Sequence, residues 1–253
     1  MNDFYQPRNA DETIRNVDDG VYASLYQQEK NACLERLLGR VNLRDKDVLE
    51  VGCGAGYWTQ RLLARGARIT AIDIRPHLVE AARSRLVGSP HEGQVRFLCG
   101  NVDDVIHSGV LFDHIFFKDV IEHVDNDQSL LRALSIRMRP NATMLIATHN
   151  AWSLNYMIEG TWERLIKRNK SWLGWDPTHV RFYTPRTLLA LAAGAGLTPI
   201  HSNGCYHIPY RFFLARLGLS RLEPSWLHAL DRRSDDNTLA KFGWSIQWLL
   251  KKE

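Results

Sequence analysis

Asp47-Val48-Leu49-Glu50-Val51-Gly52-Cys53-Gly54-Ala55-Gly56 is a short apolar run that passes directly into three closely spaced glycines, and a helical pattern follows at residues 57–65. A short apolar run ended by glycine is typical of a buried strand. Glycine has no Cβ, so the main chain can turn sharply there and a ligand can lie against it. We therefore predict a strand, a tight turn and a helix, with a ligand site at the turn.

The same alternation of short strands and helices continues along the chain. Strands are predicted at 47–51, 68–72, 95–99, 112–117, 143–148 and from 197 onward, and helices at 57–65, 76–86, 127–138 and 185–195. Short apolar strands that alternate with amphipathic helices indicate an α/β fold with a doubly wound, mostly parallel sheet covered on both faces. In such folds ligands bind at the carboxyl ends of the strands, where the strand order reverses.

The two ends of the chain do not follow this alternation of strands and helices. Apolar residues at helical spacing up to Gly39 predict an N-terminal cover helix, and a final helix is predicted around Trp244 and Trp248. We expect one domain over 1–253, with an N-terminal cover or lid at 1–40 and a cofactor-binding core at 45–205. Residues 149–183 and 206–253 would then form helices that border the acceptor pocket or dock on a surface.

Composition narrows the class of protein. The formal net charge of +4 over 253 residues is too small to predict nucleic-acid binding, although residues 157–253 hold 14 Lys and Arg against 8 Asp and Glu. The four cysteines form no C-x-x-C pair, so neither a zinc site nor a disulfide framework is expected. A polar N-terminus and the absence of any run of 18 apolar residues predict a cytoplasmic protein.

Asp73 ends the predicted strand that follows the glycine turn, at a distance where a carboxylate can bind both hydroxyls of a ribose. Dinucleotide enzymes carry G-x-G-x-x-G at such a turn. Here the pattern is acid-x-G-x-G-x-G, and Tyr57 stands in the place of their third glycine. Over residues 45–205 the sequence resembles the class I S-adenosylmethionine-dependent methyltransferases, and it is most similar to the O-methyltransferases of the ubiquinone pathway.

This resemblance implies a Rossmann-like sheet of seven strands, with extra helices at the N-terminus, after the fifth strand and at the C-terminus. It also implies S-adenosylmethionine as the cofactor. The glycines would line its methionine and ribose part, and Glu50 would support the amino acid end. The residues that the resemblance assigns to cofactor binding are Glu50, Gly52, Gly54, Gly56, Asp73, Ile74, Asn101, Val102, Asp103 and Lys118, the last through its backbone.

The segment Asp119-Val120-Ile121-Glu122-His123-Val124 resembles the family's E-x-x-E-H-V segment, which in the ubiquinone enzymes has been linked to a divalent cation. Asp119, Glu122 and His123 could share one helical face, because offsets of three and four converge. They could then hold Mg²⁺ beside an acceptor oxygen and lower its pKa. The alternative is that they cap the helix and position the cofactor.

Three histidines are candidates for a general base. His149 ends the fifth predicted strand, and His179 lies in Pro177-Thr178-His179-Val180-Arg181-Phe182-Tyr183-Thr184, which in related enzymes borders the acceptor pocket. His123 is the third. An unperturbed pKa near 6.5 lets a histidine accept a hydroxyl proton at neutral pH. The alternative for each is a structural or substrate-positioning role.

The acceptor must be chosen by the segments outside the sheet, which are rich in aromatic and basic residues. We expect methyl transfer to a hydroxyl of a small, aromatic or lipid-like molecule, in small-molecule biosynthesis. N- or C-methylation, a saccharide or macromolecular acceptor, and a non-catalytic cofactor-binding module remain as alternatives. The same segments predict peripheral membrane contact through C-terminal basic and aromatic helices, unless they only cover the core.

Overall fold

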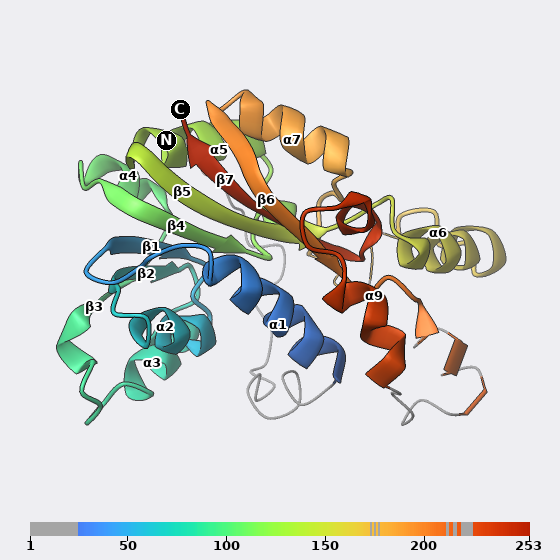
Figure 1. Cartoon of the computed structure of the whole chain (residues 1–253), viewed down its shortest axis with the longest axis horizontal. Coiled ribbons are helices and arrows are strands. Elements are labelled where there is room, and N and C mark those ends of the chain that lie inside the picture. The colour runs from blue at the N-terminus through green and yellow to red at the C-terminus, as the bar shows by residue number, and fades with distance from the viewer. Residues whose placement is uncertain are drawn as a thin grey trace.

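The computed structural model describes residues 25–253 except 173, 175, 177, 211–212, 215–216 and 219–224. A central seven-stranded sheet has helices on both faces (Figure 1). Its strands are β1 Asp47–Val51, β2 Arg68–Asp73, β3 Val95–Cys99, β4 Phe112–Lys118, β5 Met138–His149, β6 Leu197–Cys205 and β7 Ser245–Lys252. The longer helices are α1 Leu25–Leu38, α2 Tyr57–Leu63, α3 Pro76–Ser84, α5 Asp127–Ile136, α6 Leu154–Thr161 and α7 Pro185–Ala193. Shorter helical segments are α4 Asp103–His107, α9 Ala229–Arg232, η1 Glu92–Gln94, η2 Ile121–His123, η3 Trp162–Ile166, η4 Ser225–His228 and η5 Thr238–Phe242.

The strand order is β3-β2-β1-β4-β5-β7-β6. β1 pairs in parallel with both β2 and β4, so the direction of chain progression reverses between β1 and β4. The predicted doubly wound, mostly parallel α/β fold is confirmed. The four helices predicted after β1, β2, β4 and before β6 are also present, and each ends two residues earlier than predicted.

Two apolar clusters fill the spaces between the sheet and its helices. One contains Leu130 and Leu134 of α5 with Leu188 of α7, and the other contains Leu34 of α1 with Leu62 of α2. Neighbouring strand residues alternate between these clusters, because successive side chains in a strand point to opposite faces. The sheet is therefore buried on both sides, and the carboxyl ends of its parallel strands are left to form a site.

The final helix predicted around Trp244 and Trp248 is wrong. Residues 245–252 form β7, which pairs antiparallel with β5 and with β6. Trp248 packs in one apolar cluster while Leu249 packs in the other. The longest apolar run of β7, Trp248-Leu249-Leu250, is too short for the period to distinguish a strand from a helix. Within the segment 206–253, which was predicted to form helices, residues 245–252 thus return to the sheet.

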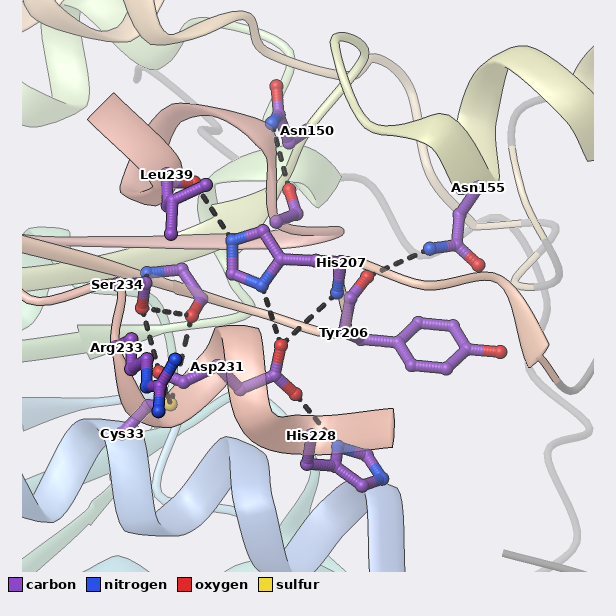
Figure 2. A network of polar contacts seen from close by, with 12 residues as sticks. Cys33, Asn150, Asn155, Tyr206, His207, His228, Asp231, Arg233, Ser234 and Leu239 are labelled. Atoms are coloured by element: carbon purple, nitrogen blue, oxygen red, sulfur yellow. Dashed lines mark hydrogen bonds and ion pairs between the residues drawn. The ribbon is translucent and has the colours of Figure 1, made fainter. Parts of the chain in front are cut away.

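A buried polar network joins His207 to α9 and η5, which lie between β6 and β7 in the sequence (Figure 2). The carboxylate of Asp231 in α9 accepts hydrogen bonds from His207 Nδ1 at 2.6 Å and from His228 Nδ1 at 2.8 Å. His207 Nε2 donates to the carbonyl of Leu239 at 2.8 Å, and Ser234 donates to the carbonyl of Gly204 at 2.7 Å. These bonds hold α9 and η5 beside the end of β6 and beside α1. None of the described helices is long and apolar enough to cross a membrane.

Candidate functional site

The glycine turn after β1 needs its three glycines for two different reasons. Gly52, Gly54 and Gly56 all have positive φ, at 77°, 52° and 87°. A Cβ on Gly52 would lie 2.4 Å from Val120 Cγ2, and one on Gly56 would lie 3.0 Å from Ala82 of α3. A Cβ on Gly54 would meet no protein atom within 4 Å. Two of the glycines therefore allow close packing, and Gly54 leaves open space along the main chain.

Asp73 at the end of β2 joins this turn to the next helix. Its Oδ2 accepts a hydrogen bond from the Gly54 amide at 2.9 Å, and its Oδ1 accepts one from the Arg75 amide at 3.0 Å. The residue is only 6% exposed. The carboxylate is thus held by two backbone donors at the point where the chain leaves β2 for α3.

A cleft that is open to solvent lies at the carboxyl ends of the first four strands. Six of the ten residues predicted to bind the cofactor line it: Gly52, Gly54, Asp73, Ile74, Asn101 and Val102. The other wall is formed by residues that follow β4 and by the segment before α7: Asp119, Val120, His123, Val124, Asp176 and Thr178. Asp176 was not predicted, although an Asp before a Pro favours a turn in which its side chain accepts from the backbone two residues further on.

The remaining four predicted residues do not line the cleft. Gly56 packs on α3, Asp103 begins α4, and the Lys118 side chain is paired with Asp119. Glu50 is buried beneath the turn, where Thr59 Oγ1 of α2 donates to it at 2.6 Å. Burial raises the pKa of Glu50 to about 8, with the Asp73 charge adding to the rise and the Thr59 hydrogen bond opposing it. Glu50 therefore supports the turn through its hydrogen bond to α2.

Asp119, Glu122 and His123 do not form the predicted metal-binding set. Asp119 has a positive φ of 51° and is followed by the short 3₁₀ turn η2, so the expected α-helical face is absent. Asp119 Oδ2 instead accepts from the Lys30 ammonium of α1 at 2.7 Å and is paired with Lys118. Burial raises the pKa of Asp119, but these two cations outweigh it and hold the pKa well below its usual range.

Glu122 and His123 face two different groups of partners. The Glu122 carboxylate accepts from Thr148 Oγ1 at 2.9 Å and from His149 Nδ1 at 3.0 Å. His123 Nδ1 is hydrogen-bonded to Thr178 Oγ1 at 2.9 Å. The structure therefore does not support the predicted Mg²⁺ site.

Other donor atoms do come together in this region. Glu122, His149 and His179 form one group, and His123, Asp176 and His179 form another, each with donor atoms within 4.8 Å of one another. Each group has two imidazoles and one carboxylate, whereas Mg²⁺ prefers oxygen ligands.

The three histidines proposed as bases are brought together although they lie far apart in the sequence. The ring of His179 lies between those of His123 and His149, with centroid distances of 4.8 Å and 4.9 Å. Only His123 lines the cleft. His149 and His179 lie behind it and contact Phe182.

The segment that carries His179 is held over the ends of β4 and β5. The Val180 amide donates to the Glu122 carbonyl at 2.9 Å, and the Tyr183 hydroxyl donates to the Asp127 carboxylate at 2.7 Å. Arg181 donates to the same carboxylate. Asp176 and Thr178 are thereby held next to His123 on the same wall of the cleft.

Known proteins resemble this chain in sequence and in fold. A family model described as "Methyltransferase domain" matches residues 22–202. A ubiquinone biosynthesis O-methyltransferase from Xanthomonas euvesicatoria pv. vesicatoria (strain 85-10) is 30% identical over 196 residues, which cover 77% of this chain and 79% of that protein. The enzyme of the same name from Idiomarina loihiensis is 27% identical over 174 residues, covering 67% of this chain and 68% of that protein.

Solved structures share the fold at lower identity. Magnesium protoporphyrin IX methyltransferase from Synechocystis PCC 6803, solved with bound SAH, has a TM-score of 0.59 and 14% identity over 90% of this chain and 83% of that one. The N-methyltransferase NodS from Bradyrhizobium japonicum WM9, in complex with S-adenosyl-L-homocysteine, has a TM-score of 0.59 and 15% identity over 96% of this chain and 93% of that one. The sheet and its cleft define a Rossmann-like methyltransferase. With the family match, this chain belongs to the class I S-adenosylmethionine-dependent methyltransferases.

The residues of the cleft fit this cofactor. An ionised carboxylate has about four lone-pair sites, and the backbone donors of Gly54 and Arg75 leave some of those on Asp73 for ribose hydroxyls. Open space beside Gly54 would let the ligand lie on the main chain. Asp119 Oδ1 is buried, and among the described residues it has no hydrogen-bond partner, so it could accept from the amino group of the methionine moiety.

Gly54→Ala should weaken S-adenosylmethionine binding without unfolding the protein. The added methyl would enter the cleft, and an extra methyl in a packed site costs about 1–3 kcal/mol, or roughly 5- to 150-fold in Kd. Gly88→Ala is the matched control, because Gly88 also has a positive φ of 75° and open space around it but does not line the cleft. Calorimetric titration and thermal unfolding of both variants measure the two effects. Equal cofactor affinity in the two variants would contradict the assigned site.

Proposed function

We propose that the protein transfers the methyl group of S-adenosylmethionine to a hydroxyl of a small, aromatic or lipid-like molecule. The observation that carries the proposal is the imidazole of His123 on the wall of the same cleft that Gly54 and Asp73 line. A hydroxyl needs a base to remove its proton as it attacks, and an imidazole supplies one at neutral pH. Relatives named as O-methyltransferases support the same acceptor chemistry.

The chain's own groups divide the work of such a transfer. S-adenosylmethionine supplies a methyl group on a sulfonium, which is already an activated donor. Asp73 and the glycine turn would hold the cofactor, while Val120, Val124 and Leu130 line the cleft with apolar surface that excludes water. His123 would accept the hydroxyl proton as the acceptor oxygen bonds to the methyl carbon and the methyl–sulfur bond breaks, leaving its electron pair on sulfur. Orientation alone can contribute about 7–11 kcal/mol in favourable cases.

His123→Gln should lower kcat with a hydroxyl acceptor by about 10²- to 10⁴-fold, the usual contribution of general-base catalysis, and leave cofactor affinity unchanged. Mass spectrometry of products from catechols, other phenols, amines and sugars would first identify the acceptor. His107→Gln is the control, because His107 is exposed and does not line the cleft. Methyl transfer to amines or carbon alone, or full activity of His123→Gln on a hydroxyl, would refute the proposal.

We also propose that the helix formed by α6 and η3 docks on an anionic membrane. Leu154, Met157, Leu165 and Ile166 along this helix are 50%, 56%, 70% and 63% exposed. Lys167, Arg168 and Lys170 follow immediately and are exposed as well. Apolar residues flanked by cations suit a surface of anionic lipid, which would also present a lipid-like acceptor. Figure 1 shows α6 at one end of the molecule, away from the sheet.

The C-terminal basic and aromatic tract predicted for the same role lies partly outside the described residues, at 211–212, 215–216 and 219–224. Described residues near it, Leu217 and Trp226, are 69% and 67% exposed. Leu217 and Trp226 add exposed apolar surface to the C-terminal part of the chain.

Vesicle flotation tests the membrane proposal. The wild type should float with vesicles of phosphatidylcholine and phosphatidylserine at low salt, and less with phosphatidylcholine alone or at moderate salt, because salt screens the lysines and arginines. Leu165→Ser with Ile166→Ser should abolish flotation. Ile136→Ser, at a 64% exposed position on the C-terminal turn of α5, is the control. A wild type that stays in the aqueous fraction under every condition would refute membrane docking.

A further inference from the structure

Thr178 links His123 to a carboxylate on the cleft wall. The Thr178 hydroxyl lies 2.6 Å from Asp176 Oδ1, and the Thr178 amide donates to the same oxygen at 2.8 Å. The other neighbour of the hydroxyl is His123 Nδ1 at 2.9 Å. Asp176, Thr178 and His123 all line the cleft. They form a chain of hydrogen bonds that ends at the imidazole.

The directions of the two hydrogen bonds of the Thr178 hydroxyl follow from its having a single proton. Burial raises the pKa of Asp176, but the Thr178 hydroxyl and amide outweigh it and lower the pKa below its usual value, so the group is an ionised carboxylate that only accepts. A hydroxyl has one proton, and the short contact with a charged acceptor is the stronger place for it. Thr178 Oγ1 therefore donates to Asp176 and must accept from His123.

This direction fixes the tautomer of the neutral imidazole. If Thr178 Oγ1 accepts, His123 Nδ1 carries the proton, and Nε2 keeps the lone pair. The opposite tautomer would need the hydroxyl proton to leave Asp176, which would lose the hydrogen bond to the charged oxygen. His149 is anchored in a similar way, through Nδ1 to Glu122, but it does not line the cleft.

We propose that Thr178 and Asp176 are positioning residues that hold His123 with its proton on Nδ1, so that Nε2 accepts the proton of the methyl acceptor. The proposal rests on the O-methyltransferase function proposed above. It adds two residues that act through His123, and it explains why the segment before α7 is tied to the residues that follow β4.

Nitrogen-15 NMR of the histidine rings in the full-length protein tests the tautomer directly. Spectra are recorded on protein dialysed against EDTA, at a pH where His123 is neutral, and its signals are assigned by difference with His123→Gln. The expected result is a proton on Nδ1 in the wild type and in Thr178→Ser. Thr178→Val, which keeps the shape and removes the hydroxyl, should shift His123 toward a mixture of tautomers. A proton on Nε2 in the wild type, or an unchanged spectrum in Thr178→Val, would overturn the proposal.

Kinetics then test the consequence for catalysis. Thr178→Val should lower kcat about tenfold or more, which is part of the 10²- to 10⁴-fold that a general base supplies, with no change in cofactor affinity. Thr178→Ser should restore most of the rate. A shifted tautomer with unchanged kcat would overturn the positioning role. If no hydroxyl acceptor is found, the function proposed above fails, whereas the NMR result still decides whether Thr178 sets the tautomer.

Discussion

The hydrogen bonds from the Gly54 and Arg75 amides to the Asp73 carboxylate are the contacts on which the rest of the site depends. They join the turn after β1 to the start of α3, across the carboxyl ends of two neighbouring strands. A buried donor left without a partner costs about 1–3 kcal/mol. The left-handed conformation of Gly54 points its amide toward Asp73. The turn therefore also fixes the position of the Asp73 carboxylate in the cleft.

The opposite wall of the cleft depends on contacts between segments far apart in the sequence. Glu122 joins η2 to the end of β5 through Thr148 and His149, and its carbonyl accepts from Val180 in the segment before α7. β7 then pairs with β5 along its length, including His149 opposite Ser245. The histidines are therefore fixed by the sheet, by η2 and by the loop before α7 together. This arrangement places one imidazole on the cleft and two behind it.

Local sequence patterns predicted much of this architecture. The apolar runs at 47–51 and 95–99 match β1 and β3 at both ends, because each is a short strand bounded by polar or glycine residues. The acid-x-G-x-G-x-G turn and Asp73 were also predicted from short stretches of sequence, and in the structure the Gly54 amide donates to the Asp73 carboxylate. The C-terminal strand was missed because its longest apolar run, residues 248–250, is too short to show whether the period is that of a strand or of a helix.

The errors at the site also have physical causes. Asp119 was expected on a helix with Glu122, but its positive φ and its pairing with Lys30 in α1 depend on tertiary contacts across 89 residues. Asp176 and Thr178 were not assigned to the reaction, because their bond to His123 spans 55 residues. Spacing rules describe side chains on one regular element, and these residues lie on turns that the rest of the fold holds in place.

Calorimetric titration with S-adenosylhomocysteine and with its 2′-deoxy analogue measures how much the proposed hydrogen bond between Asp73 and the ribose contributes to affinity. Removing a hydroxyl that a buried carboxylate accepts from should weaken binding to the wild type about tenfold or more, since such a bond is worth about 1.5–3 kcal/mol. In Asp73→Ala both ligands should bind weakly and with equal affinity, because the partner of the hydroxyl is gone. Equal affinity of the wild type for the two ligands, or no binding of S-adenosylhomocysteine to the folded wild type, would contradict the account.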